Sequence, residues 1–204
     1  HIVDQEEMSI LNGNRKNSGK NSVINDKRTV RMSDFLQNKS GKNFAFPSLR
    51  NWIFDILVGT AIVQLTEGNE DYYLSAVLHA AIAKTLHRDE KGIIEQAFQV
   101  LIEALEENIN DKNFQKYVTE SYDDLIQSVR EYSVLRIPTI NEVLNRIAKV
   151  DENGEIEGLI NEVDIKQVNS DSDIDTLLNV STGELKLENS LTIFVGGQVL
   201  DRGI

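Results

Sequence analysis

The chain has no cysteine among its 204 residues, and it has only two prolines, three histidines and one tryptophan. Without cysteine it can form no disulfide, no thiolate nucleophile and no cysteine-based metal site. No apolar run approaches the roughly 20 residues that a membrane-spanning helix needs, and no signal peptide is visible. We therefore expect a cytoplasmic chain without a membrane partner.

The composition is that of a soluble globular domain, with 40% hydrophobic and 26% charged residues. A chain of this length can bury one good core, or one domain with an extended arm. It begins with His1 instead of methionine and stops soon after a glycine-rich loop at Gly196-Gly197. We therefore expect it to be part of a longer protein.

The net charge of −12 is unevenly distributed along the chain. The segment between Asn12 and Lys42 contains eight lysines and arginines but only two acidic residues, Asp26 and Asp34, so its charge is +6. The rest of the chain therefore carries a charge of −18. Phosphate contacts supply most nonspecific affinity for nucleic acids, so an acidic body binds them poorly. We therefore expect any nucleic-acid surface to be local, or to lie on parts of the protein outside this sequence.

Residues 1–45 contain many Asn, Ser, Lys and Gly residues and few large apolar ones, which is typical of a flexible linker. Residues 13–20 come close to a phosphate-binding loop, but the second glycine is one residue late and Asn21 replaces the required Ser or Thr. We interpret the segment as a basic flexible arm, from which residues 30–36 are expected to dock on the body.

Four stretches of the body place their apolar residues at helical spacing. These stretches are residues 48–65, 90–108, 113–132 and 138–150. Ser48 and Asp89 are the predicted N-caps of the first two helices. Pro138 is predicted to lie in the first turn of the fourth helix, next to Thr139. We expect these helices to cover a sheet.

Three other stretches are candidate strands. The alanines of residues 72–83 favour a helix, whereas their compact apolar run permits a buried strand, and periodicity does not decide between them. Residues 163–168 alternate as a strand does, and residues 191–195 form an apolar run typical of a strand buried on both faces of a parallel sheet. An acidic turn at 151–158, with its tip at Asn153-Gly154, precedes the last two of these stretches.

The most distinctive motif follows the last candidate strand. Gly196 and Gly197 let the backbone approach a ligand without a Cβ in the way. Arg202, followed by Gly203, supplies a planar guanidinium beyond the carboxyl end of that strand, where open α/β sheets usually bind ligands. Taken alone, however, the motif is better explained as a buried strand that ends in a glycine turn.

Three motifs together resemble a known family. They occur in the order Ser75…His79, Val168-Asn169-Ser170 and Gly196-Gly197…Leu200-Asp201-Arg202-Gly203. In this order and approximate spacing they resemble the Z-one domain, a family of proposed endonucleases found with bacterial restriction and phage-defence genes. The third motif also resembles motif V of superfamily-two helicases.

The resemblance covers about residues 46–204, because the helix start at Pro47-Ser48-Leu49 is also similar to the family's. Two residues depart from the family pattern, namely Ala76 and Asp201. The second departure bears on the site, since a carboxylate next to Arg202 would partly neutralise its charge.

The resemblance implies a strand at residues 75–81 and an α/β fold. This fold would be a partial RecA-like (P-loop NTPase) lobe, with a parallel sheet of at least three strands covered by several helices. Residues 46–204 would be the truncated second motor lobe, and residues 1–45 the arm. The parent protein would be an ATP-dependent hydrolase that acts on DNA, helicase-like or an endonuclease.

The resemblance also implies roles for individual residues. Arg202 would be catalytic and would stabilise charge on a transferred phosphoryl group, or it would hold the loop to a carboxylate. Gly196, Gly197 and Gly203 would contact the cofactor, and Asn169 and Ser170 the nucleic acid. ATP and Mg²⁺ are expected for the parent protein, with the first motor lobe as a partner.

We expect neither cofactor nor metal in this chain by itself, because it contains no Walker loop and no Asp-Glu magnesium motif. The acidic run at 171–175 also lacks a calcium loop's glycine and glutamate, since threonine stands at 176 and 182.

Two alternatives remain open at this point. The chain could be a non-enzymatic α/β interaction domain that binds a partner through the acidic helices at 90–108 and 113–132. It could also be a small helical protein in which residues 72–86 form a helix and the C-terminal strands form a minor hairpin.

Overall fold

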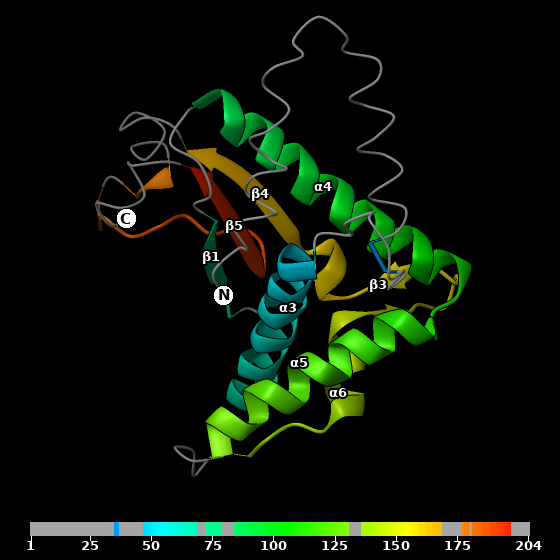
Figure 1. Ribbon diagram of the computed structural model, residues 1–204. Coiled ribbons are helices and arrows are strands. Elements are labelled where there is room, and N and C mark those ends of the chain that lie inside the picture. Colours follow the sequence, from blue (N-terminus) through cyan, green and yellow to red (C-terminus); the bar gives the residue numbers. More distant parts are fainter. Residues whose placement is uncertain are drawn as a thin grey trace, which may run out of the picture.

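The computed structural model describes residues 35–36, 47–68, 72–78, 84–130, 136–168, 177–179 and 181–196 (Figure 1). The elements follow in the order α3 (Pro47–Glu67), β1 (Leu74–Leu78), α4 (Lys84–Glu107), α5 (Lys112–Arg130), α6 (Ile140–Ile147), β2 (Lys149–Val150), β3 (Ile156–Glu157), the 3-10 turn η2 (Leu159–Asn161), β4 (Val163–Val168) and β5 (Leu191–Gly196).

The three longer strands form one parallel sheet in the order β1-β5-β4. β5 lies in the middle, and all six of its residues are buried. A strand with neighbours on both sides and cover on both faces has no solvated face, which explains its uninterrupted apolar sequence. The predicted parallel sheet with the final apolar run inside it is confirmed.

The alternative of a small helical protein is wrong. Residues 74–78 form β1 instead of a helix, and β5 pairs in parallel with both neighbours instead of closing a hairpin. Parallel pairing with β5 overrides the helix preference of Ala76, although Leu78 is the one buried residue of β1 and Val77 is half exposed.

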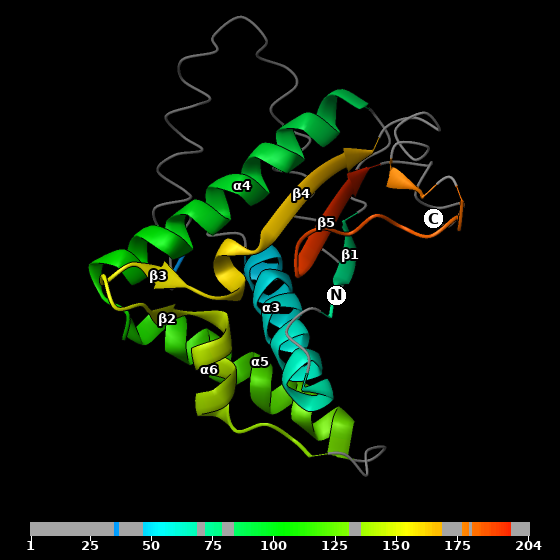
Figure 2. The same cartoon turned by 180° about the vertical axis from the view of Figure 1, so that it is seen from behind.

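Other parts of the chain pack against both faces of the sheet (Figures 1 and 2). Leu191, Ile193 and Val195 join the main apolar core, to which α4 contributes as it packs on β4 and β5. Phe194 forms a smaller cluster on the other face with Val168 and with leucines of the 177–187 segment. Connections on opposite faces are what right-handed crossovers predict for a chain that moves outward to β4 and back to β5.

The helical half consists of α3, α5 and α6, with α3 packing on both of the others. Phe54 of α3 contacts two rings of α5, with centroid distances of 5.5 Å to Phe114 and 5.4 Å to Tyr117. α5 starts after Asp111, whose Oδ1 accepts the Phe114 backbone N–H at 2.8 Å. This capping bond satisfies an N–H group that has no partner inside the helix.

Three predicted helix boundaries are wrong. Ser48 lies inside α3 instead of preceding it as the N-cap. α4 starts at Lys84, so Asp89 lies inside the helix instead of capping it. The preceding residues include lysine, leucine and arginine, which favour helix as well as the residues that follow. The fourth helix ends at Ile147, and Pro138 lies before the N-cap instead of in the first turn.

The helix stops early because the chain turns into a small antiparallel hairpin, in which β2 pairs with β3. Its turn confirms the predicted tip, since Gly154 has a φ of 86°. Asp151 closes the turn by accepting the backbone N–H groups of Asn153 and Glu155 at 2.8 and 2.7 Å. The bond from Glu155 is the main reason why the pKa of Asp151 is lowered.

Within the predicted N-terminal arm, the described residues are Phe35 and Leu36, and both are buried in the main core. The expectation that residues 30–36 dock on the body is met for these two residues. The other residues of the arm lie outside the described part.

The N-terminus of α6 offers a test of local stability. Thr139 Oγ1 accepts the Glu142 backbone N–H at 3.3 Å, and Glu142 Oε2 accepts the Thr139 backbone N–H at 2.8 Å. Thr139→Ala removes half of this capping box and should lower the free energy of unfolding by about 1 kcal/mol in urea denaturation. Thr119→Ala, at an exposed position inside α5, should change it by less than about 0.5 kcal/mol. Equal effects of the two variants would contradict the capping assignment.

Candidate functional site

The carboxyl ends of the three parallel strands lie level at one edge of the sheet. Leu78, the last residue of β1, pairs with Val195, and Val168, the last residue of β4, pairs with Gly196. Parallel strands lie about 4.8 Å apart, so the chain leaves the sheet three times within a short distance. Gly196 ends the central strand at this edge and presents no Cβ there.

Gly196 is the one predicted site residue that lies in the described part of the chain. The other predicted site residues lie outside it, namely Asn169, Ser170, Gly197, Arg202 and Gly203, and so does His79 of the first motif. The described part of the three motifs thus ends at Leu78, Val168 and Gly196, and it includes Ser75 in β1.

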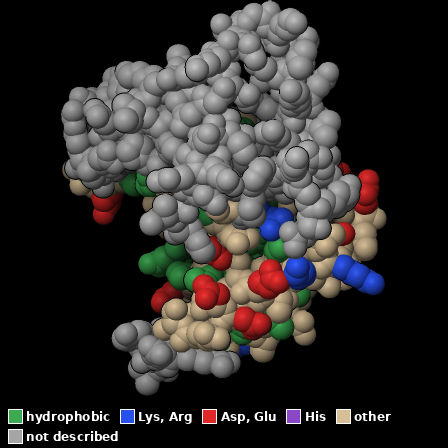
Figure 3. All heavy atoms as spheres, in the orientation of Figure 1, with side chains coloured by type: hydrophobic (Ala, Val, Ile, Leu, Met, Phe, Trp, Pro, Cys, Tyr) green, Lys and Arg blue, Asp and Glu red, His purple; other side chains and the backbone are tan. Residues whose placement is uncertain are grey.

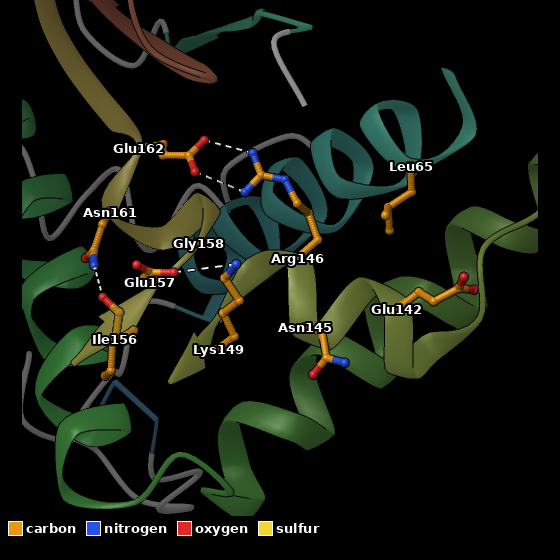
Figure 4. Close-up of a pocket in the computed structure, with 10 residues that line it drawn as sticks. All are labelled: Leu65, Glu142, Asn145, Arg146, Lys149, Ile156, Glu157, Gly158, Asn161 and Glu162. Carbon is orange, nitrogen blue, oxygen red and sulfur yellow. Dashed lines mark hydrogen bonds and ion pairs between the residues drawn. The ribbon is translucent and has the colours of Figure 1, made fainter. Parts of the chain in front are cut away.

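The opposite edge of the sheet carries a polar cluster that the sequence did not reveal (Figure 4). Arg146 of α6, only 7% exposed, binds Glu162 with two parallel bonds, Nη1–Oε1 at 3.1 Å and Nη2–Oε2 at 2.7 Å. Arg146 Nη2 also donates to Ser190 Oγ at 3.3 Å, and Ser190 Oγ donates to Glu162 Oε2. We call these three residues the arginine clamp.

The arginine clamp fastens α6 to the starts of all three strands. Glu162 directly precedes β4 and Ser190 directly precedes β5. The backbone carbonyl of Glu162 accepts the Leu191 N–H at 3.2 Å, and that of Ser190 accepts the Leu74 N–H at 3.0 Å. The three side chains come from distant parts of the sequence and match no short motif, so spacing could not have identified them.

Glu162 is held as a carboxylate by this environment. Its partial burial alone would raise its pKa, but bonds from Arg146 and Ser190, with the charges of Arg146 and Lys149, hold the pKa of Glu162 below its usual value. Both carboxylate oxygens accept bonds, which leaves the group committed to Arg146 and Ser190. The clamp therefore stabilises the fold and is a poor candidate for acid–base chemistry.

A pocket of about 660 Å³ lies beside the arginine clamp. Figure 4 shows its lining from α3, α6, the hairpin and η2, namely Leu65, Glu142, Asn145, Arg146, Lys149, Ile156, Glu157, Gly158, Asn161 and Glu162. Several polar groups here already bind each other, as Lys149 Nζ does with Glu157 at 3.4 Å and Asn161 Nδ2 with the Ile156 carbonyl at 2.6 Å. This pocket lies at the amino ends of the strands, whereas open α/β sheets bind ligands at the carboxyl ends.

A smaller pocket of about 230 Å³ lies between α3 and α5 and is acidic. Burial raises the pKa of Asp55, a bond from Ser121 opposes this effect, and the charge of Asp124 adds to it. Asp55, Glu120 and Asp124 line this pocket, yet no group of three or more His, Asp or Glu side chains in the described residues is arranged to hold a metal ion.

Among the described residues, no helix is both long enough and apolar enough to span a membrane.

The fold defines a mixed α/β domain built on a parallel sheet, with a candidate ligand edge at the carboxyl ends of its strands. A family model described as the Z1 domain matches residues 48–204, which is most of the chain. The chain therefore belongs to the Z1 domain family, the Z-one family that its motifs resemble. No curated protein and no solved structure matches the chain.

The arginine clamp yields a prediction for Glu162→Gln. This variant keeps the shape of the side chain but removes the charge that faces the buried Arg146. At pH 7 we expect a loss of about 1–3 kcal/mol in the free energy of unfolding, below the usual range for a fully buried pair because Glu162 is partly exposed. The control Glu95→Gln acts on the exposed pair with Lys91 and should have a smaller effect.

The same variant should show a defined pH dependence. Because the pKa of Glu162 is lowered in the folded state, its contribution is complete above its unfolded value of 4.5 and is lost as the pH falls through the lower folded value. Urea denaturation between pH 7 and pH 3 should therefore show the difference between wild type and Glu162→Gln shrinking below about pH 4.5. A difference that stays constant down to pH 3 would contradict the ionic role of Glu162.

Proposed function

We propose that the chain is part of an ATP-dependent protein that acts on DNA in a bacterial restriction or phage-defence system. In this proposal it is the partial second RecA-like lobe of a helicase-like motor or endonuclease. The observation that carries the proposal is the level ending of β1, β5 and β4, with Gly196 at the end of the central strand. Each of the three motifs begins within or directly at one of these strand ends.

The proposed chemistry follows from the residues that come next in the chain. Neighbouring residues are 3.8 Å apart along the backbone, so the positions directly after the three strand ends start from one edge. The backbone amides of Gly196 and Gly197 would receive phosphate or sugar oxygens, as glycine nests do. Asn169 and Ser170 would contact the nucleic-acid backbone.

Arg202 and Gly203 complete the proposed site. The guanidinium of Arg202 would stabilise charge on a transferred phosphoryl group, a task for which its planar fork of donors is suited. Gly203 would leave room for the nucleotide beside it. Arg202 is separated from Gly196 by five residues, which is a short enough span for both to serve one phosphate group.

ATP and Mg²⁺ belong to the proposed parent protein. Magnesium bridges phosphate oxygens and neutralises their charge when it is bound. The described part of the edge ends in Leu78, Val168 and Gly196, which offer backbone groups and no carboxylate. This composition fits contact with phosphate oxygens, whereas the magnesium ligands would come from the first motor lobe.

Because the magnesium ligands are proposed to come from the first motor lobe, we expect no ATP hydrolysis by the chain alone. Phosphate release from Mg-ATP, measured with and without DNA, should equal that of the Arg202→Ala variant. The reason is that phosphoryl transfer requires metal and phosphate clamps beyond those of this chain. Turnover by wild type above the Arg202→Ala background would contradict the proposal that catalysis needs the other lobe.

A second prediction concerns DNA. At low salt, fluorescence anisotropy with a short labelled oligonucleotide should show weaker binding for Arg202→Ala, by about three- to tenfold, and a salt slope lower by about one. Asn169→Ala with Ser170→Ala should weaken binding similarly.

The matched control is Arg136→Ala, which removes an exposed arginine next to the start of α6. It should leave the affinity for DNA nearly unchanged, since it lies outside the proposed edge. If Arg136→Ala weakens binding as much as Arg202→Ala, binding reflects overall charge and the proposed site is wrong.

A non-enzymatic interaction domain is the second candidate, and one observation favours it. Exposed carboxylates line both long helices, at Glu95, Glu103, Glu106 and Glu107 of α4 and at Glu120, Asp123 and Asp124 of α5. Figure 3 shows several carboxylate groups on the part of the surface that is not drawn in grey. A basic protein partner would fit them. Replacing the α4 glutamates by glutamine should abolish binding to such a partner, and it should not weaken binding to DNA.

A further inference from the structure

Two residues that precede the matched family region are part of the domain's core. Phe35 is 0% exposed and Leu36 is 6% exposed, although the family match starts at residue 48. Both belong to the apolar cluster that contains the buried face of α3. Phe35 is also one of the largest fully buried side chains.

A buried arginine fixes the backbone at this point. Arg50, in the first turns of α3, is 5% exposed, and its Nη1 donates to the Phe35 carbonyl at 3.1 Å. The same guanidinium lies over the ring of Tyr117 of α5, 4.0 Å from the centroid. Burying a charge is costly unless it is hydrogen-bonded, so the Phe35 carbonyl helps to hold Arg50 in place as much as Arg50 holds the carbonyl.

The Tyr117 ring connects this contact to the rest of the helical half. Tyr117 is 4% exposed and packs against Phe54 of α3 at 5.4 Å between ring centroids. Phe35, Arg50 and Tyr117 thus form a continuous path from the N-terminal segment through α3 to α5. Burial of Phe35 and Leu36 stabilises the folded state, because the free energy gained is proportional to the apolar area removed from water.

We propose that the surface around Arg50 and Tyr117 is a docking site for an aromatic–aliphatic residue pair. The site recognises two apolar side chains and one backbone carbonyl, which Arg50 binds. Its occupant is Phe35–Leu36 of the same chain. This pair, the docked pair, holds the chain at residues 35 and 36 to the helical half, independently of any nucleotide or DNA.

Limited trypsin digestion of the full chain tests the proposal. The bonds after Arg31 and Lys39 lie four residues before Phe35 and three residues after Leu36. Proteolysis follows the population of the open form, so Phe35→Ala should speed cleavage at these two bonds by at least about tenfold. Cleavage after Lys20, farther from the docked pair, should keep its wild-type rate. Mass spectrometry of the products measures each bond.

Two further variants separate docking from a general loss of stability. Arg50→Met keeps Phe35 but removes the donor to its carbonyl, and it should also speed cleavage after Arg31 and Lys39. Val168→Ala removes a buried side chain from the separate cluster on the other sheet face, and it should lower Tm without affecting these bonds. Phe35→Ala should lower Tm by about 5–15 °C.

The proposal fails if Phe35→Ala leaves the cleavage rates after Arg31 and Lys39 unchanged. It also fails if Val168→Ala speeds cleavage there as much as Phe35→Ala does below the unfolding transition. Either result would mean that Phe35 acts as an ordinary core residue and holds no segment to the body.

Discussion

The pairing of β5 between β1 and β4 is the constraint on which the rest of the structure depends. A strand buried along all six residues must find backbone partners on both sides, because an unpaired buried N–H or C=O group is costly. Parallel pairing on both sides then fixes the register of all three strands. As a consequence their carboxyl ends lie level, and the motif residues of the family follow from one edge.

The amino and carboxyl ends of the parallel strands differ in the residues that they present. At the amino end, Arg146, Glu162 and Ser190 bind one another and hold the strand starts to α6. Both carboxylate oxygens of Glu162 and both Nη atoms of Arg146 take part in these bonds, which contribute to stability. At the carboxyl end, the described chain finishes in apolar residues and Gly196, which presents no Cβ there. A rigid amino end suits a ligand edge, since the position of each strand end is then determined by the fold.

Much of the fold could be predicted from local patterns. The apolar run at 191–195 indicated a central parallel strand, and Asn153-Gly154 indicated the hairpin tip, because both depend on nearby residues only. The start of α4 was predicted too late. Residues 84–88 favour a helix, but no capping residue and no apolar stripe in the sequence marks them as its first turn. The arginine clamp was missed because it joins residues 16 to 44 positions apart, and such contacts leave no periodic signal.

The candidate site could be predicted only in part. The three motifs correctly indicated three strand ends, and pairing brings these ends together, which local sequence could not show. The contribution of Phe35 and Leu36 was foreseen as docking of a short amphipathic piece, but the role of Arg50 was not. An arginine between Leu49 and Asn51 near a helix start reads as a surface residue, and its burial becomes evident only once Tyr117 packs beneath it.

A two-dimensional amide NMR titration with a short DNA oligonucleotide tests the central claim most directly. If the carboxyl edge of the sheet faces phosphate, the backbone amides of Gly196 and Val168 will shift with increasing DNA. The amides of Asn145, Lys149 and Asn161, beside the pocket at the amino edge, will keep their positions. Shifts confined to this second group, with Gly196 unchanged, would contradict the account.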